Sequence, residues 1–349
     1  MKVKKTILGE LEKCYSLCLL DYNQKKHILV AAEKINKCLL FDMNGKLEET
    51  VWEQPGGVMS MVQVPGSNGV FLATHKFYSP NDSAEAKIVI AEPITKNNWK
   101  IRTLVKLPFV HRFDILQKNG VNYLIACTLK SDHTYKEDWT SPGKVYAAIL
   151  PDDLSGYDEE NQLQLQVIAE GFTRNHGYYR NHPGECDSAV LSCNNGVYHF
   201  TAPGNQGDKW VIEQLLDTPA SDAVLIDLDR DGSKELFVMS PFHGDTVSIY
   251  KKYNGTYEKI YEYPQKLEFL HAIYGGDINE IPTVIIGYRK GKRELLAFRS
   301  DYMGGYLVER LDMDAGAANI LHYKLDDKEI VVATNREIDE IAMYELAEN

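Results

Sequence analysis

The sequence has no long apolar run and no excess of positive charge. None of its 349 residues lies in an apolar stretch long enough to span a membrane, so the sequence predicts no membrane association. The formal net charge is −12 at pH 7, whereas proteins that bind nucleic acid are generally basic. The composition therefore argues against DNA or RNA as a partner.

The six cysteines show no C-x-x-C spacing, which excludes the usual zinc knuckle and redox pair. The N-terminal segment MKVKKTILGELEK starts with basic residues. Glu10, Glu12 and Lys13 then stand where a signal peptide needs its apolar core. We therefore expect reduced, buried thiols and a cytoplasmic protein.

What the sequence does contain is an internal repeat: an apolar strand, a tight polar turn and a strand rich in β-branched residues. Seven copies start at Cys14, Val58, Val110, Asp187, Ser221, Leu270 and Ala317. Asn119-Gly120 and Asp231-Gly232 supply turn residues that tolerate positive φ. Two more strand-like segments follow each pair, such as TVSIYKK and YEKIYEY. Four antiparallel strands repeated radially predict an all-β fold, a seven-bladed β-propeller.

The seventh copy is too short for four strands. Only 33 residues run from Ala317 to Asn349, enough for three strands. The segment KVKKTILGE at residues 2–10 reads like the other fourth strands, so we expect it to complete the last blade and remove an open sheet edge. An open solenoid is the alternative, but polar capping repeats are not evident. The prediction is one propeller domain over residues 1–349.

The copy at Ser221 carries the sharpest motif, DLDRDGSKELFV. Its acidic residues are Asp227, Asp229, Asp231 and Glu235. The segment resembles the D-x-D-x-D-G core of the repeats called FG-GAP or VCBS, whose members often bind Ca²⁺ through alternate carboxylates. The resemblance implies a calcium site at Asp227, Asp229 and Asp231. A plain hairpin turn is the alternative, because the other six copies lack the full set.

Histidines are concentrated in one class of loop. In a propeller, the links into the inner strands and the loops after the second strands open on the same face, here called the top face. Seven of the ten histidines fall in these segments: His75, His111, His133, His176, His182, His243 and His271. His111 and His271 begin inner strands, and we assign Asp187 and Asp222 the matching place in two other blades. We therefore expect a functional site in the funnel at this face.

His, Tyr and Arg side chains without a Ser or Cys nucleophile motif suit proton transfer, because His and Tyr serve as base and acid while Arg neutralises a carboxylate or enolate. The predicted catalytic residues are His111, His176, Tyr179, Arg180, His243 and His271. The predicted substrate-binding residues are His75, Lys76, Arg112, His182, Asp187, Asp222, Tyr288 and Arg289. This chemistry fits β-elimination from a uronate, or dehydration or isomerisation of a keto-sugar.

The architecture and these residue types together resemble certain propeller-type polysaccharide lyases. The VCBS-like repeats are also similar to the propeller domain of aldos-2-ulose dehydratase/isomerase, an enzyme with additional cupin domains that this chain lacks. The resemblance implies a carbohydrate-active lyase, dehydratase or isomerase whose partner is a small sugar or oligosaccharide. It covers the whole chain in architecture, but its catalytic residues are assigned by position rather than by motif.

Three other functions stay open. Histidines with nearby carboxylates could hold Zn²⁺ or a similar ion, although no H-x-x-x-H or H-E-x-x-H pattern is present. Many propellers are non-catalytic binding platforms. Asp187 and Asp222 leave glycoside hydrolysis, which needs two carboxylates, as a third possibility. Nothing in the sequence predicts an oligomeric state.

Overall fold

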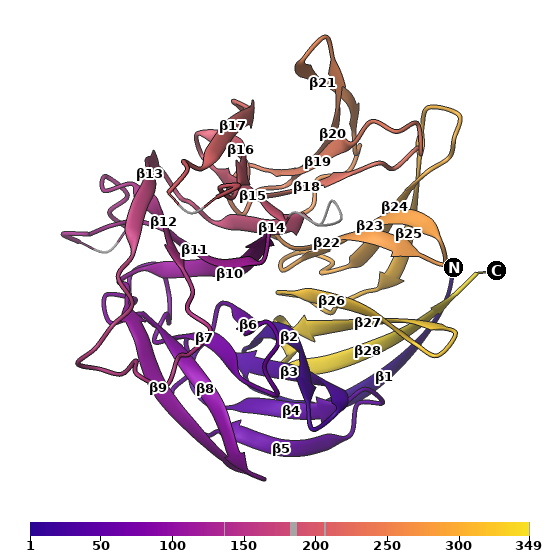
Figure 1. Cartoon of the computed structure of the whole chain (residues 1–349). Coiled ribbons are helices and arrows are strands. Elements are labelled where there is room, and N and C mark those ends of the chain that lie inside the picture. The colour runs from indigo at the N-terminus through magenta and orange to yellow at the C-terminus, as the bar shows by residue number, and fades with distance from the viewer. Residues whose placement is uncertain (136, 182–186, 206, 349) are drawn as a thin grey trace. The chain divides into compact units, whose positions relative to one another are not determined.

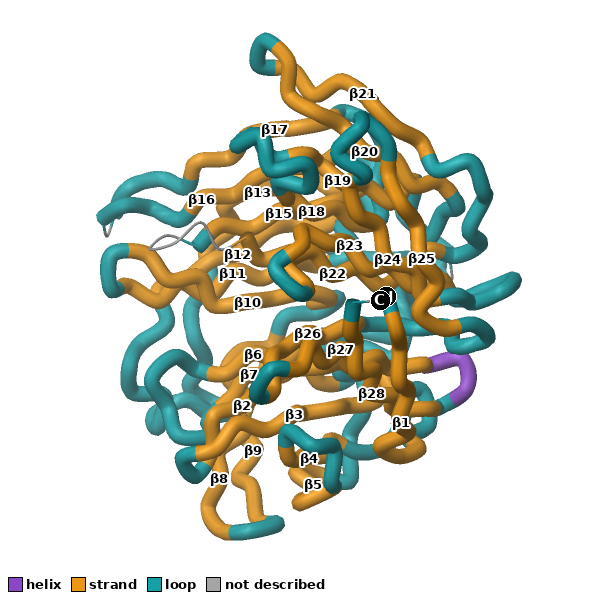
Figure 2. The backbone as a smooth tube through the Cα atoms, turned by 90° about the vertical axis from the view of Figure 1, so that its right-hand side faces the viewer, coloured by secondary structure: helices purple, strands orange, loops and turns teal. Residues whose placement is uncertain are grey.

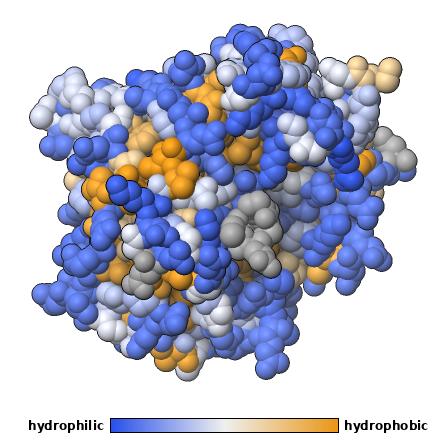
Figure 3. Space-filling model, turned by 45° about the horizontal axis from the view of Figure 1, so that its top comes forward, coloured by the Kyte–Doolittle hydropathy of each residue, from blue (hydrophilic) through white to orange (hydrophobic). Residues whose placement is uncertain are grey.

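The computed structural model describes residues 1–135, 137–181, 187–205 and 207–348. In these residues the chain forms strands β1 to β28 and one short 3-10 helix, Arg336–Ile338 (Figures 1 and 2). The strands make seven four-stranded sheets. No helix in the described ranges has the length and apolarity needed to cross a membrane. On the face shown in Figure 3, hydrophilic side chains predominate and apolar ones form patches between them.

The first three sheets run in chain order from inner to outer strand. The first contains β2 (Cys14–Tyr22), β3 (Lys25–Ala32), β4 (Cys38–Asp42) and β5 (Leu47–Trp52). The second contains β6 (Met61–Gln63), β7 (Phe71–His75), β8 (Lys87–Thr95) and β9 (Asn98–Lys106). The third contains β10 (Val110–Lys118), β11 (Val121–Thr128), β12 (Gly143–Ile149) and β13 (Gln166–Phe172).

The next three sheets have the same order. The fourth contains β14 (Gly177–Asn181), β15 (Ser188–Cys193), β16 (Gly196–Thr201) and β17 (Val211–Leu216). The fifth contains β18 (Asp222–Ile226), β19 (Glu235–Ser240), β20 (Thr246–Tyr253) and β21 (Thr256–Glu262). The sixth contains β22 (Leu270–Ile278), β23 (Ile281–Tyr288), β24 (Leu295–Ser300) and β25 (Tyr306–Asp312).

The seventh sheet joins the two ends of the chain. Its order is β26 (Ile320–Leu325), β27 (Lys328–Asn335), β28 (Glu340–Ala347) and β1 (Lys2–Glu10). Strand β1 pairs antiparallel with β28 from Lys2 opposite Ala347 to Glu10 opposite Glu340. The two termini therefore lie side by side (Figure 1). The pairing expected for KVKKTILGE is present over the predicted residues.

The burial pattern explains why these segments form strands. Several middle strands are largely apolar and buried on both faces, as in β23 with its sequence IPTVIIGY. The outer strands keep many exposed side chains, as in β21 with TYEKIYE. Turn chemistry sets the hairpins: Asn119 and Gly120 have φ of 50° and 78° between β10 and β11, which a two-residue turn requires.

The chain groups into two compact units. Unit 1 contains Met1–Cys14, Val190–Tyr198 and Gln214–Asn349, and unit 2 contains Tyr15–Ala189 and His199–Glu213. In unit 2 a core cluster includes Leu29, Phe71 and Trp99, and in unit 1 another includes Ile285, Val331 and Tyr344. The all-β class and the seven-bladed propeller architecture are confirmed, while a single domain over residues 1–349 stays a prediction.

The fourth sheet differs from the sequence-based assignment. The segment that starts at Asp187 was expected to be its inner hairpin, but the inner strand is β14, and Asp187 lies just before the second strand, β15. The physical reason is that β14 has the sequence GYYRN, whose polar, partly buried side chains do not resemble an apolar inner strand. Asp187 therefore does not occupy the place at the start of an inner strand that Asp222 occupies.

Candidate functional site

The orientation of the His111 side chain in unit 2 is set by an irregular backbone. This histidine is the second residue of β10, and the pairing with β11 shifts register between Val110 and Arg112, so His111 forms a β-bulge. Phe109, just before the strand, has a φ of 63°, a left-handed conformation unusual for a bulky residue. The imidazole Nδ1 lies 3.2 Å from the carbonyl oxygen of His176. Phe77 packs edge-on against the ring at 5.1 Å between centroids.

His271 in unit 1 has the same construction. It is the second residue of β22, at a register shift between Leu270 and Ala272, and Phe269 before it has a φ of 66°. The imidazole Nδ1 lies 2.8 Å from the carbonyl oxygen of Ala318. Sheets three and six thus share the pattern Phe-x-His at the start of the inner strand, with the same strain and the same bulge.

These backbone bonds set the tautomer of both imidazoles. A carbonyl oxygen only accepts hydrogen bonds, so Nδ1 of His111 and of His271 carries the proton. In the neutral ring, Nε2 is then the nitrogen with the lone pair, which can accept a proton or ligate a metal. Strained residues cost about 1–3 kcal/mol each and cluster at functional sites, so the repeated Phe-x-His device points to a use for these two nitrogens.

Aromatic rings surround each imidazole. In unit 2, the ring of His176 lies 4.7 Å from that of His111. In unit 1, His243 stacks on Phe269 at 4.3 Å and on His271 at 5.4 Å. His243 sits in the turn after β19 with a φ of 47°. A ring nitrogen of His243 and one of His271 lie within 4.8 Å of each other.

Arg289 contributes positive charge beside His271. Its guanidinium carbon lies 4.9 Å from the centroid of Phe269, the ring that runs nearly parallel to the His271 imidazole at an angle of 3°. Glu337 holds the guanidinium through contacts of 2.7 Å to Nε and Nη2. Tyr288, the neighbouring residue, instead donates its hydroxyl to Glu294, and burial followed by this hydrogen bond raises its pKa well above the ordinary value.

Arg180 in unit 2 is neutralised inside the protein. Its guanidinium pairs with Asp187 and lies 3.5 Å from Asp114, two buried carboxylates. Burial lowers the pKa of Arg180, but Asp114 and Asp187 more than compensate, so the net shift is upward. Asp187 also accepts the backbone N–H of Gln117 at 2.9 Å. Tyr179, the residue before Arg180 on β14, is partly exposed.

The remaining predicted binding residues lie in several environments. Lys76 pairs with Glu85 at 2.8 Å, and Arg112 donates to the carbonyl oxygen of Met59 at 2.8 Å. Asp222 is buried at the start of β18. His182 lies outside the described residues. The convergence of all these residues in one funnel stays a prediction.

His75 is buried against the edge of Trp52, with 4.7 Å between ring centroids. Burial, and then the charges of Lys87 and Lys76, lowers the pKa of His75 to about 3. The His75 imidazole is more basic in the unfolded chain, where its pKa has the ordinary value of 6.5, than in the folded chain. Its contribution to stability is therefore complete above pH 6.5 and is lost as the pH falls towards 3.

We expect His75→Leu to make the melting temperature less dependent on pH below 6.5. The wild-type melting temperature should fall more steeply than that of the variant between pH 6.5 and 4, because only the wild type must keep an imidazole uncharged. Thermal melts of both proteins at matched ionic strength measure the difference. Equal slopes across this range would contradict the argument.

The acidic DLDRDG loop between β18 and β19 is contacted by a lysine of the same sheet, Lys251 on β20. The Lys251 ammonium lies 2.6 Å from Asp229 Oδ2, 2.8 Å from Asp231 Oδ2 and 2.7 Å from Glu235 Oε1. Oxygens of Asp227, Asp229 and Glu235 lie within 4.8 Å of one another, as cation ligands would. Burial lowers the pKa of Lys251, but the three carboxylates raise it well above its ordinary value overall. A calcium ion at the predicted site of Asp227, Asp229 and Asp231 would therefore compete with this ammonium for the carboxylate oxygens.

The sequence indicated many of the site residues but not the charged residues that form ion pairs with them. Glu337, Asp114 and Lys251 come from segments far from Arg289, Arg180 and Asp229 in the chain, and nothing local marks them as partners. The Phe-x-His pattern was readable, because FVH and FLH stand at the same point of two repeats.

Seven four-stranded sheets with an oriented imidazole at the start of two inner strands define a seven-bladed β-propeller with a candidate site. No protein-family model matches the chain, and no curated protein matches it either. Among solved structures, the chain is similar to the propeller of Dos1, with a TM-score of 0.56 and 9% identity over 93% of this chain and 76% of that one. It is also similar to a glucose dehydrogenase, with a TM-score of 0.50 and 14% identity over 99% of each chain. Likeness at these identities shows the fold alone.

Proposed function

We propose that this protein is a carbohydrate-active enzyme, a lyase, dehydratase or isomerase that removes a proton from a carbon next to a carbonyl or carboxylate. The observation that carries the proposal is the Phe-x-His device, which uses backbone strain to aim Nε2 of His271 and of His111. Propellers also serve as binding platforms, but an imidazole with a fixed tautomer favours the enzyme, because proton transfer needs a defined nitrogen lone pair.

The residues of unit 1 suit such a step. His271 Nε2 accepts the proton from the carbon acid, and the imidazolium that forms keeps its Nδ1–H bond to the carbonyl of Ala318. Arg289, held by Glu337, stabilises the enolate oxygen that develops. In an elimination, the electron pair then forms a C=C bond while the C–O bond to the leaving group breaks and that oxygen takes up a proton. In an isomerisation, the proton returns to the neighbouring carbon, while the hydroxyl proton moves from one oxygen of the enediol to the other as the carbonyl changes place.

The test combines two assays. Uronate-containing oligosaccharides are followed for the ultraviolet absorbance of an unsaturated product, and keto-sugars are followed by NMR for exchange of the α-proton in D₂O. We expect His271→Asn to lower kcat by about 10²-fold or more, the usual contribution of a general base. Asparagine can still donate to the carbonyl of Ala318 but offers no Nε2, so the fold should be retained.

His322→Asn is the matched control. His322 is another partly buried histidine of unit 1, hydrogen-bonded to Tyr274 at 2.8 Å and to Glu329 at 2.6 Å, and it is not part of the Phe-x-His device. Its replacement should leave kcat within a small factor. Absence of turnover on both substrate classes, or an unchanged rate in His271→Asn, would refute the proposal.

A metal-dependent sugar enzyme is the second candidate. The nitrogens of His243 and His271 within 4.8 Å of each other favour it, and an Nδ1 bond to a backbone carbonyl is typical of histidines that ligate a metal. Imidazole suits Zn²⁺ and similar ions. Elemental analysis of protein purified without chelator, compared with His243→Ala, distinguishes the two: a stoichiometric metal that the variant loses supports this candidate.

A further inference from the structure

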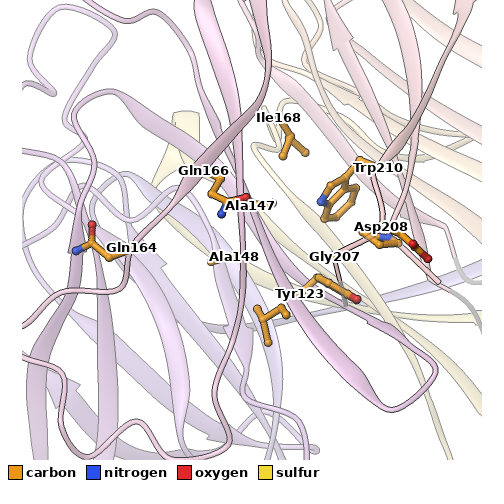
Figure 4. Close-up of a pocket in the computed structure, with 11 residues that line it drawn as sticks. Tyr123, Ala147, Ala148, Gln164, Gln166, Ile168, Gly207, Asp208 and Trp210 are labelled. Carbon is orange, nitrogen blue, oxygen red and sulfur yellow. The ribbon is translucent and has the colours of Figure 1, made fainter. Parts of the chain in front are cut away.

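A cavity lies in unit 2, at the opposite end of the third sheet from His111. Its volume is about 390 Å³, within the range of small-molecule sites. Tyr123 on β11 lines it, and Tyr123 pairs with Leu116 near the far end of β10, whereas His111 is at the start of that strand. The cavity, whose lining is drawn in Figure 4, is therefore separate along the strand from the Phe-x-His device of this sheet.

Two aromatic rings form one side of this cavity. Tyr123 and Trp210 meet edge to face, with 5.9 Å between ring centroids and an angle of 78° (Figure 4). Ile168 and Ala147 add apolar surface. Trp210 is only partly buried, so part of the indole remains accessible. Such a surface suits a flat, weakly apolar partner.

The polar groups around the cavity are neutral or acidic. Gln164, Gln166 and Asp208 are exposed at its rim, and no Lys, Arg or His is among the described residues that line it. The Tyr123 hydroxyl is buried and has no hydrogen-bond partner among the described residues, although leaving a buried polar atom unpaired usually costs about 1–3 kcal/mol. Burial and then the charge of Asp208 raise the pKa of Tyr123, so this hydroxyl is a donor at neutral pH.

We propose that this cavity, here called the Trp210 cavity, binds an uncharged pyranose, as a mono- or disaccharide or the end of a longer chain. A pyranose offers a C–H face for the indole and hydroxyls for the two carboxamides, the Asp208 carboxylate and the Tyr123 hydroxyl. An anionic ligand would find no countercharge here. The site is independent of the proposed enzyme activity and would hold a sugar whether or not His271 is catalytic.

Binding of cellobiose, maltose and lactose to the full chain tests the proposal, by isothermal titration and by saturation-transfer NMR. We expect saturable binding of at least one sugar with quenching of tryptophan fluorescence. Trp210→Ala should weaken that binding at least tenfold. Tyr123→Phe should weaken it about fivefold, as expected for the loss of one hydrogen bond.

Stability separates a binding role for Tyr123 from a structural one. Because its hydroxyl is buried without a partner, Tyr123→Phe should leave the melting temperature unchanged or raise it while affinity falls. Tyr302→Phe, at a tyrosine that is 57% exposed in unit 1, is the matched control and should change neither. Failure of all three sugars to bind, or equal affinity in wild type, Trp210→Ala and Tyr123→Phe, would overturn the proposal, whatever the outcome of the assays on His271.

Discussion

Removal of residues 1–10 should lower the melting temperature by about 7 °C and expose a sheet edge that promotes self-association. Strand β1 is hydrogen-bonded along almost the whole of β28, and Lys5 reaches Asp312 at 2.8 Å and Glu340 at 2.7 Å. The deletion also uncovers Leu346 and Tyr344, which are buried. Lost and newly exposed apolar groups together amount to about 5 kcal/mol, or about 7 °C for a chain of this size.

Thermal melts and size-exclusion chromatography measure these effects. A synthetic peptide with the sequence of residues 1–12 is the matched control, because it can add the missing strand to the edge of β28 from outside. It should restore most of the lost melting temperature, and a scrambled peptide of the same composition should not. A truncated protein that melts at the wild-type temperature would show that β1 does not stabilise the last sheet.

Replacement of Lys251 by alanine should destabilise the protein by about 3 kcal/mol. The ammonium contacts three carboxylates, and one of them, Glu235, is fully buried. Removing one partner of a buried ion pair leaves an uncompensated charge, which typically costs about 3–5 kcal/mol. Lys252→Ala is the matched control: the next lysine of β20 is exposed and should change stability by no more than about 0.5 kcal/mol.

Calcium then distinguishes the two uses of this acidic loop. In Lys251→Ala the oxygens of Asp227, Asp229 and Glu235 are available to a divalent cation, so added Ca²⁺ should recover part of the lost stability. In the wild type the ammonium competes for the same oxygens, and Ca²⁺ should leave the melting temperature unchanged. A calcium-dependent rise in the wild type would instead support the metal site implied by the DLDRDG motif.

The sequence predicted the sheets well wherever apolar alternation and turn chemistry agreed. Segments such as IPTVIIGY and the turn Asn119-Gly120 have one reasonable interpretation, and strand 2–10 followed from the shortage of residues after Ala317. Strand β14 could not be found this way. Its Arg180 is tolerated in an inner strand because Asp114 and Asp187, which are not its neighbours in sequence, neutralise it.

The candidate site was predictable in its residue types but not in its geometry. His111 and His271 stood out as histidines at the start of inner strands. Their aim depends on a bulge, a positive φ at the preceding phenylalanine and a carbonyl from the segment before another inner strand, which no local pattern encodes. The ion pairs were even harder to predict. Arg289 pairs with Glu337 and Lys76 pairs with Glu85, and nothing in the local sequence of either cation indicates its partner.

The pairing of β1 with β28 also imposes an order on biosynthesis. Strand β1 leaves the ribosome more than 300 residues before its partner, on the order of half a minute earlier at usual translation rates. Throughout that time the segment lacks the strand with which it pairs in the folded protein. Its three lysines, Lys2, Lys4 and Lys5, oppose premature pairing with other nascent chains, because charge on an open edge discourages association. Strand β1 is therefore made long before the strand that it pairs with, and its lysines lower the risk of a wrong pairing in that interval.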